Sequence, residues 1–180
     1  MVSAGKRPVL WQPTTQGPGD PAWDGVLPDT SVYMIWLNSK SAQRYAQNGS
    51  DVVYTTPFYV AGMGSNGWTS VYNAEIMPPN LTTTQQRHVL GAEICMWGES
   101  MNAANLNERG FSIGVAAAEN FWRHNDHANG PASASGLGIS DRYNRFLCHL
   151  RRFGIAAAPV MPSWCEVIHG VGSLDLYSGN

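Results

Sequence analysis

The chain has 180 residues, enough for one domain with a hydrophobic core, and its 11 Lys plus Arg against 13 Asp plus Glu give a formal net charge of -2. Without a basic patch, a nucleic-acid partner is not expected, and 13% charged residues with 19 Gly, 11 Pro and 7 Trp indicate a loop-rich, aromatic-rich globular chain. No window reaches the roughly 18 apolar residues of a membrane helix, and residues 1–20 contain no apolar run, so neither a membrane span nor a signal peptide is predicted in this chain.

Short apolar runs alternate with helical patterns in the first part of the chain. The expected strands are residues 8–11, 31–36, 51–56 and 89–96. A Pro/Gly-rich loop, residues 13–28, separates the first two strands. Ser39 is expected to cap a helix over residues 42–47 that Gly49 ends, and Pro57 is expected to stop the third strand.

The second part of the chain is predicted to contain more helix. Residues 62–87 are interpreted as one long irregular loop, residues 111–122 have helical character, and residues 129–138 form a Gly/Ser/Ala-rich loop. A final helix, capped at residues 140–141, runs to Gly154. The alternation of strands and helices predicts a parallel sheet with helices outside it.

The run from Val89 to Glu99 combines an apolar strand with a tryptophan and an acid. On extended chain, Trp97 and Glu99 point to the same face, and six residues place Glu93 roughly 20 Å from Glu99. An indole and a carboxylate together suit a sugar, because the indole face packs on C–H bonds while the carboxylate accepts from hydroxyls. The alternative is a core strand whose last turn carries a solvated acid.

Aromatic residues recur at the carboxyl ends of the predicted strands. Trp11, Trp36, Tyr59 and Trp97 each lie at or just past such an end. In a parallel barrel, this edge is where the active site is built from several strands. Four rings in succession are difficult to place in a core, because strand ends open onto loops. Ordinary core packing is the alternative for each ring.

Cysteines and glycosylation triplets indicate whether the protein follows the secretory route. Cys148 and Cys165 flank a helix end and a Pro-rich turn and are placed to close a short loop, whereas Cys95 is interpreted as a buried free thiol. Asn48 and Asn80 begin acceptor triplets for N-glycosylation. Such triplets arise by chance and three cysteines do not prove oxidation, but together they favour the secretory route. A secretory protein whose chain shows no signal is expected to have its true N-terminus elsewhere.

Several motifs occur in an order that defines a resemblance. They are Gly-Ala-Glu-Ile-Cys-Met-Trp-Gly-Glu at residues 91–99, Asn-Leu at 105–106, Ala-Ala-Ala-Glu-Asn-Phe-Trp at 116–122, Arg-Tyr-Asn-Arg-Phe-Leu-Cys at 142–148 and Arg-Phe-Gly-Ile-Ala-Ala at 152–157. They resemble the C-terminal part of family 20 glycoside hydrolases, the β-N-acetylhexosaminidases, lysosomal hexosaminidases among them. The resemblance runs from about residue 8 to about residue 167. The spacing of Cys148 and Cys165 is similar to the C-terminal disulfide of the lysosomal enzymes.

The resemblance implies a (β/α)8 TIM barrel, in which the four predicted strands are strands five to eight, followed by a C-terminal helix. Residues 1–180 are then a partial catalytic domain, since a whole barrel takes about 250 residues. Half a barrel leaves two open sheet edges. We therefore expect a longer protein, a separate N-terminal half, or a truncated product. Lysosomal members are dimers, so a homodimer is another expected assembly.

The family's chemistry is substrate-assisted retaining hydrolysis, in which the sugar's 2-acetamido group is the nucleophile. An adjacent Asp-Glu pair ending the fourth barrel strand orients the acetamide, protonates the leaving oxygen and then activates water. No Asp-Glu dipeptide occurs in the 180 residues, and Glu93 and Glu99 are expected to be too far apart to replace it. Losing general acid catalysis costs about two to four decades in rate, so this chain by itself is expected to be inactive.

The resemblance also assigns the pocket, whose ligand is the terminal N-acetylhexosamine of a glycan. Trp11, Trp36 and Trp97 would wall the sugar site. Tyr59 would donate its hydroxyl to the acetamide oxygen, which makes it the one catalytic residue expected in this chain. Glu99 would accept from the 4- or 6-hydroxyl.

Some positions depart from the family pattern. Ala61 stands where a sugar-binding aspartate is expected, a loss of about 1–3 kcal/mol of contact. Pro13 stands where an acid is common, and Asn120 replaces an arginine. Glu93 and Glu119 are expected to anchor loops or helices through buried hydrogen bonds.

The remaining expectations concern cofactors, compartment and class. The pair His124-x-x-His127 lies in a polar segment and is not expected to bind a metal, and no cofactor motif is evident. The resemblance implies a lysosomal or secreted parent protein. Two hypotheses stay open: the C-terminal half of a β-N-acetylhexosaminidase, acting on N-acetylglucosamine or N-acetylgalactosamine, and a noncatalytic fragment that binds sugar weakly or not at all.

Overall fold

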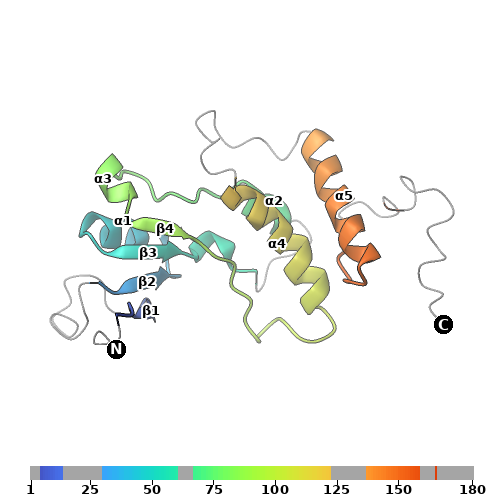
Figure 1. The fold of residues 1–180 in the computed structure, drawn as a ribbon, viewed down its shortest axis with the longest axis horizontal. Coiled ribbons are helices and arrows are strands. Elements are labelled where there is room, and N and C mark those ends of the chain that lie inside the picture. The colour runs from blue at the N-terminus through green and yellow to red at the C-terminus, as the bar shows by residue number, and fades with distance from the viewer. Residues whose placement is uncertain (1–4, 14–29, 61–66, 123–136, 159–164, 166–180) are drawn as a thin grey trace. The chain divides into compact units, whose positions relative to one another are not determined.

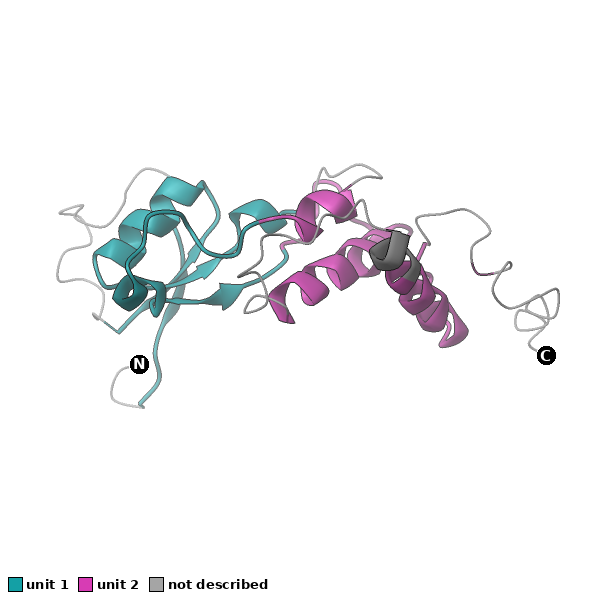
Figure 2. Cartoon of the chain, turned by 90° about the horizontal axis from the view of Figure 1, so that it is seen from above, with its two compact units in different colours: residues 1–59, 75–94 teal, residues 60–74, 95–180 magenta. Residues whose placement is uncertain are grey.

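The computed structural model describes residues 5–13, 30–60, 67–122, 137–158 and 165 (Figure 1). These residues belong to two compact units (Figure 2). The first unit comprises residues 1–59 and 75–94, and the second comprises residues 60–74 and 95–180. Each unit is described by itself.

The first unit contains a four-stranded parallel sheet. Its strands are β1 (Val9–Trp11), β2 (Val32–Ile35), β3 (Asp51–Tyr54) and β4 (Val89–Ala92), and they are hydrogen-bonded in the order β1-β2-β3-β4 (Figure 1). The prediction of four parallel strands is confirmed. Because all the pairings are parallel, the four carboxyl ends lie along one edge of the sheet.

The last strand is shorter than predicted. A register shift between Val52 and Val53 leaves Leu90 as an extra residue in β4, and the strand ends at Ala92. A turn occupies residues 98–100. The prediction of one strand through residue 96 is therefore wrong. The shared face of Trp97 with Glu99 and the separation of roughly 20 Å were inferred from an extended chain that the turn interrupts, and they stay predictions.

Helix α1 (Ser39–Gln47) covers one face of the sheet. The Asn38 side chain caps it, accepting from the Ser41 backbone N–H at 2.9 Å, so the prediction of a Ser39 cap is wrong by one residue. Gly49 has φ +79° and ends the helix as predicted. The core between α1 and the sheet consists of Ile35, Ala42, Tyr45, Val52 and Tyr54, with Tyr33 and Val89 packed against it.

The prediction of one irregular loop over residues 62–87 is wrong. These residues include helix α2 (Gly67–Tyr72) and helix α3 (Thr83–Gln86). Helix α3 begins with a capping box, in which the side chains of Thr82 and Gln85 each accept from the other's backbone N–H. That signature is visible in the sequence and was overlooked.

The second unit packs α2 against two longer helices, α4 (Leu106–Trp122) and α5 (Leu137–Arg152). Its core consists of Trp68, Tyr72, Ala116, Tyr143, Leu147 and Ala157. Helix α4 begins five residues before the predicted start at residue 111. Helix α5 begins at Leu137, so the predicted cap at residues 140–141 is wrong, and Gly154 follows its end with φ +80°.

Two polar contacts connect the helices of the second unit. Asn120 is buried in α4, and its amide donates to the carbonyls of Val71 at 2.9 Å and Ala74 at 2.8 Å, which secures the end of α2. Glu119 forms an ion pair with Arg142 of α5. Glu119 thus connects two helices, as expected, but through an exposed contact rather than a buried hydrogen bond. Buried Asn120 has a structural role of its own.

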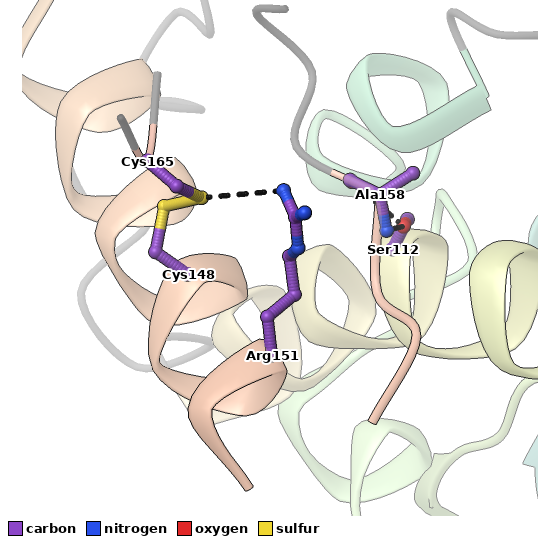
Figure 3. Close-up of a disulfide and its surroundings, with 5 residues drawn as sticks. All are labelled: Ser112, Cys148, Arg151, Ala158 and Cys165. Atoms are coloured by element: carbon purple, nitrogen blue, oxygen red, sulfur yellow. Dashed lines mark hydrogen bonds between the residues drawn. A yellow bond between two sulfur atoms is a disulfide. The ribbon is translucent and has the colours of Figure 1, made fainter. Parts of the chain in front are cut away.

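A disulfide joins Cys148 of α5 to Cys165 (Figure 3). Arg151 donates to Cys165 Sγ at 3.7 Å. Nearby, the Ser112 hydroxyl of α4 donates to the carbonyl of Ala158 at 2.9 Å and accepts from its N–H at 3.1 Å. Figure 3 shows both contacts. The predicted disulfide is confirmed, and so is the buried free thiol at Cys95.

Tyr143 stacks on Trp68 within this core, with ring centroids 4.8 Å apart, but its hydroxyl is buried without a hydrogen-bond partner among the described residues. Burial raises the pKa of this phenol. A buried unsatisfied hydroxyl costs about 1–3 kcal/mol. We therefore expect Tyr143→Phe to raise the free energy of unfolding by about 1 kcal/mol in urea titrations. A loss of stability of that size would show that the hydroxyl has a partner.

Candidate active site

Trp11 is the last residue of β1 and lies in register with Met34 of β2. Its neighbour Leu10 pairs with Tyr33, which packs on the α1 side of the sheet. Because side chains alternate along a strand, Trp11 projects from the opposite face, the face that α1 leaves open. Trp11 is 42% exposed in this chain, and its role in a site stays a prediction.

Trp36 follows β2 directly and is half-buried. Its indole Nε1 donates to the backbone carbonyl of Gln12 at 2.8 Å. The Gln12 side chain in turn accepts from the Leu37 N–H at 3.2 Å. The end of β2 is thereby joined to the end of β1, and the indole of Trp36 is held in one orientation.

Tyr59 follows β3 after a short 3-10 helix, η2 (Thr56–Phe58). Its ring lies 6.3 Å from that of Trp36, centroid to centroid, with 32° between the ring planes. Two of the four predicted aromatic residues are therefore neighbours at the carboxyl edge of the sheet. Pro57 lies inside η2, and β3 had already ended at Tyr54.

Glu93 follows β4 at the same edge. The side chain is half-buried, and burial raises the pKa of its carboxyl above the ordinary value. A carboxyl group whose pKa is raised by burial at such an edge is a candidate for a role in a site. We assigned it an anchoring role from the sequence, and that assignment stays a prediction.

Trp97 and Glu99 belong to the second unit, in the segment before α4. Trp97 is 42% exposed and Glu99 is exposed. The segment is seated on α4 by Met96, whose Sδ would lie 2.9 Å from a Cβ added at Gly110. A side chain at residue 110 would therefore require the flexible end of the Met96 side chain to shift.

The glycosylation triplets lie away from the aromatic edge. Asn48 is the exposed C-cap of α1, directly before the start of β3. Asn80 is exposed with φ +57°, and its carbonyl accepts from the Gln47 side chain at 3.3 Å. Both acceptors therefore lie near the amino ends of the strands, where a glycan would leave the opposite edge uncovered.

A cluster of charged side chains lies at the amino edge of the sheet. Asp51, the first residue of β3, forms an ion pair with Arg7 and contacts His88 Nδ1 at 2.8 Å. Burial raises the pKa of the Asp51 carboxyl, but hydrogen bonds and charge from His88 and Arg7 outweigh it, and the net shift is downward.

A lowered pKa in the folded state stabilises the fold above the unfolded value of 3.8, and this contribution is lost as the pH falls below it. We expect it to be below about 1 kcal/mol, because the pair is partly screened by solvent. Urea titrations of the parent and Asp51→Asn at pH 6 and pH 3 test this. The stability difference between them should shrink at pH 3, and a constant difference would contradict it.

Neither a metal cluster nor a membrane span is evident where the structure describes the chain. No three metal-binding side chains gather among those residues, and no helix among them is long and apolar enough to cross a bilayer. Ala61, His124 and His127 lie outside the described residues, as do most of the predicted loops at 13–28 and 129–138.

Sequence reasoning missed two residues that organise this edge, Gln12 and Thr55. Both are buried polar residues directly after a strand. Thr55 donates its hydroxyl to the carbonyl of Ile35 at 2.8 Å. A polar residue that interrupts an apolar run was the available signal, since buried polar groups are hydrogen-bonded.

The parallel sheet carries aromatic residues along its carboxyl edge, the edge at which α/β barrel enzymes build their sites. Residues 1–125 match the glycosyl hydrolase family 20 catalytic domain, and the chain belongs to this family. The structure resembles the X-ray structure of Flavobacterium johnsoniae chitobiase, with a TM-score of 0.68 at 18% identity over 88% of this chain and 23% of that one. The four parallel strands thus match part of a family 20 catalytic TIM-barrel domain.

Curated relatives include three β-hexosaminidase subunits. Subunit beta of Sus scrofa is 28% identical over 94% of this chain and 30% of its own length. Subunit B2 of Dictyostelium discoideum is 30% identical over 89% of this chain and 28% of its own length. Subunit alpha of Rattus norvegicus is 29% identical over 78% of this chain and 27% of its own length. The chain therefore spans less than a third of the relatives it matches.

Proposed function

We propose that this chain provides the sugar-binding half of a β-N-acetylhexosaminidase catalytic barrel, strands five to eight with a C-terminal helix. Its ligand is the terminal N-acetylglucosamine or N-acetylgalactosamine of a glycoconjugate. The observation that carries the proposal is the pairing of Trp36 with Tyr59, near exposed Trp11, at the carboxyl edge of a family 20 sheet.

Each ring has a proposed role. The indoles of Trp11 and Trp36 pack on the C–H face of the sugar and on the acetamide methyl group. Tyr59 donates its hydroxyl to the acetamide carbonyl oxygen, which aims that oxygen at the anomeric carbon. Trp97 and Glu99 belong to the second unit, and the sugar-binding roles that the family resemblance implies for them stay predictions.

The reaction is retaining hydrolysis, in which the acetamide oxygen attacks the anomeric carbon and water opens the cyclic intermediate. It needs an Asp-Glu pair, and the 180 residues contain none. These carboxylates are supplied by the remainder of a longer protein or by a separate N-terminal half. The open outer sides of β1 and β4 in the described sheet support such a partner, because unpaired edges favour further strand pairing.

A second candidate is a truncated noncatalytic fragment that binds sugar weakly or not at all. The missing Asp-Glu pair and Ala61, at a position where the family resemblance implies an aspartate, favour it. The two candidates differ in whether the carboxylates are supplied.

The assembly and compartment follow from the same family. A homodimer is the alternative to a missing N-terminal half, and residues 1–180 act as one partial catalytic domain. The disulfide between Cys148 and Cys165 and the exposed Asn48 and Asn80 support a secretory-pathway protein, lysosomal or secreted.

Titration of the 15N-labelled chain with N-acetylglucosamine tests the sugar site. We expect saturable shifts of the Trp36 indole signal, and weaker shifts with glucose, which lacks the acetamide. Trp36→Ala should abolish binding. Trp122→Ala is the matched control, because Trp122 is 90% exposed at the end of α4 and is outside the proposed site. Equal responses to the two sugars, or none, would refute the proposal.

A further inference from the structure

Gln12 is buried, 4% exposed, at the carboxyl end of β1, and its hydrogen bonds lead to β2 and the residues just after it. Its N–H donates to the carbonyl of Met34 at 2.9 Å. Its carbonyl accepts from Trp36 Nε1 at 2.8 Å, and its side-chain Oε1 accepts from the Leu37 N–H at 3.2 Å. The backbone and the side chain of one residue therefore hold Trp36 from both sides.

Thr55 makes the corresponding connection between β2 and β3. The carbonyl of Ile35, the residue before Trp36, accepts from the Thr55 N–H at 2.9 Å and from its hydroxyl at 2.8 Å. The Thr56 hydroxyl donates to the same oxygen at 3.2 Å. The start of the segment that leads to Tyr59 is thus tied to the residue that precedes Trp36.

These two connections converge on one pair of rings. The last hydrogen bonds between the strands orient a ring at or just past a strand end, because the chain is leaving the sheet there. The backbone carbonyl of Gln12 holds the indole, and its side chain holds the Leu37 N–H directly after Trp36. Thr55 holds the start of the segment that leads to Tyr59. The centroid distance of 6.3 Å and the angle of 32° between the rings are therefore set before any sugar arrives.

We propose that Gln12 and Thr55 are positioning residues that preorganise Trp36 and Tyr59 for N-acetylhexosamine. This inference rests on the proposed function, which supplies the ligand. Rings that are already oriented lose less conformational freedom on binding, so affinity depends on the hydrogen bonds that orient them. The loss of one such bond is expected to weaken binding about fivefold.

Two pairs of variants of the full chain separate positioning from general stability. Gln12→Met removes the side-chain acceptor at nearly equal length, whereas Gln12→Glu keeps an acceptor oxygen. Thr55→Val removes the hydroxyl at equal shape, whereas Thr55→Ser keeps it. The readouts are the Trp36 indole N–H signal, assigned by its loss in Trp36→Phe, and the affinity for N-acetylglucosamine.

We expect Gln12→Met and Thr55→Val to shift the Trp36 indole signal and to weaken binding of N-acetylglucosamine about fivefold. Gln12→Glu and Thr55→Ser should restore both. If Gln12→Met does not fold, Thr55→Val and Thr55→Ser test the positioning role. Thr55→Val is expected to fold, because the Ile35 carbonyl still accepts from two other donors.

The two proposals fail in different ways. The positioning role is overturned if the indole signal does not move in folded Gln12→Met and Thr55→Val. It is also overturned if Gln12→Glu and Thr55→Ser lose as much affinity as those variants, even if the parent chain binds the sugar. A parent chain that does not bind N-acetylglucosamine, but whose indole signal moves as expected in Gln12→Met, overturns the proposed function and supports the positioning role.

Discussion

The purified chain alone is expected to show no turnover of a chromogenic N-acetyl-β-glucosaminide above the rate in buffer. The reason is chemical, since no Asp-Glu pair is present to orient the acetamide and protonate the leaving oxygen. Co-expression with the N-terminal half of a family 20 catalytic domain that carries this pair should restore turnover, by at least the two to four decades that general acid catalysis contributes, roughly 10²–10⁴-fold.

Two controls accompany this measurement. The same N-terminal half with both carboxyl residues changed to amides should restore nothing. In the restored complex, Tyr59→Phe should lower turnover, because the acetamide oxygen loses the hydroxyl that aims it. Turnover by the chain alone that Tyr59→Phe abolishes would contradict the prediction and show that the carboxylates are dispensable.

Removal of the disulfide is expected to have the largest effect on stability. Cys148→Ala opens the loop that Cys165 closes, 17 residues along the chain, and should lower the free energy of unfolding by about 3 kcal/mol. Urea titrations with and without reductant measure this. Reductant should bring the parent chain down to the stability of Cys148→Ala and leave that variant unchanged.

Cys95→Ala is the matched control for this experiment. Cys95 is a buried free thiol, so its replacement alters packing without opening a covalent loop. The stability of Cys95→Ala should remain sensitive to reductant, as in the parent. If reductant does not affect the parent chain, the bond does not stabilise this fold.

The helical boundaries show where local sequence is sufficient and where it is not. Gly49 and Gly154 end their helices as predicted, because a positive φ is a property of the residue itself. Helix α2 was missed because its six residues are too few for a periodic pattern. It is held by Asn120, which is far along the chain and donates to the carbonyls of Val71 and Ala74.

In the candidate site, too, local sequence predicts some features and contacts between distant residues decide the others. That Trp11, Trp36 and Tyr59 lie at or just past strand ends was predictable from apolar runs and their ends. The end of β4 was not, because the register shift beside Val53 depends on pairing with β3. Buried Gln12 was overlooked for a similar reason, since its partners become neighbours only once two strands are aligned.

By itself, the sequence determined the class of sheet, the family through its motifs and the absence of the Asp-Glu pair from these 180 residues, because these depend on residue types and their spacing. Only the tertiary structure decided that Trp36 and Tyr59 are neighbours and that Gln12 orients the indole. Contacts between strand ends depend on register and on buried hydrogen bonds between distant residues, which no local pattern encodes.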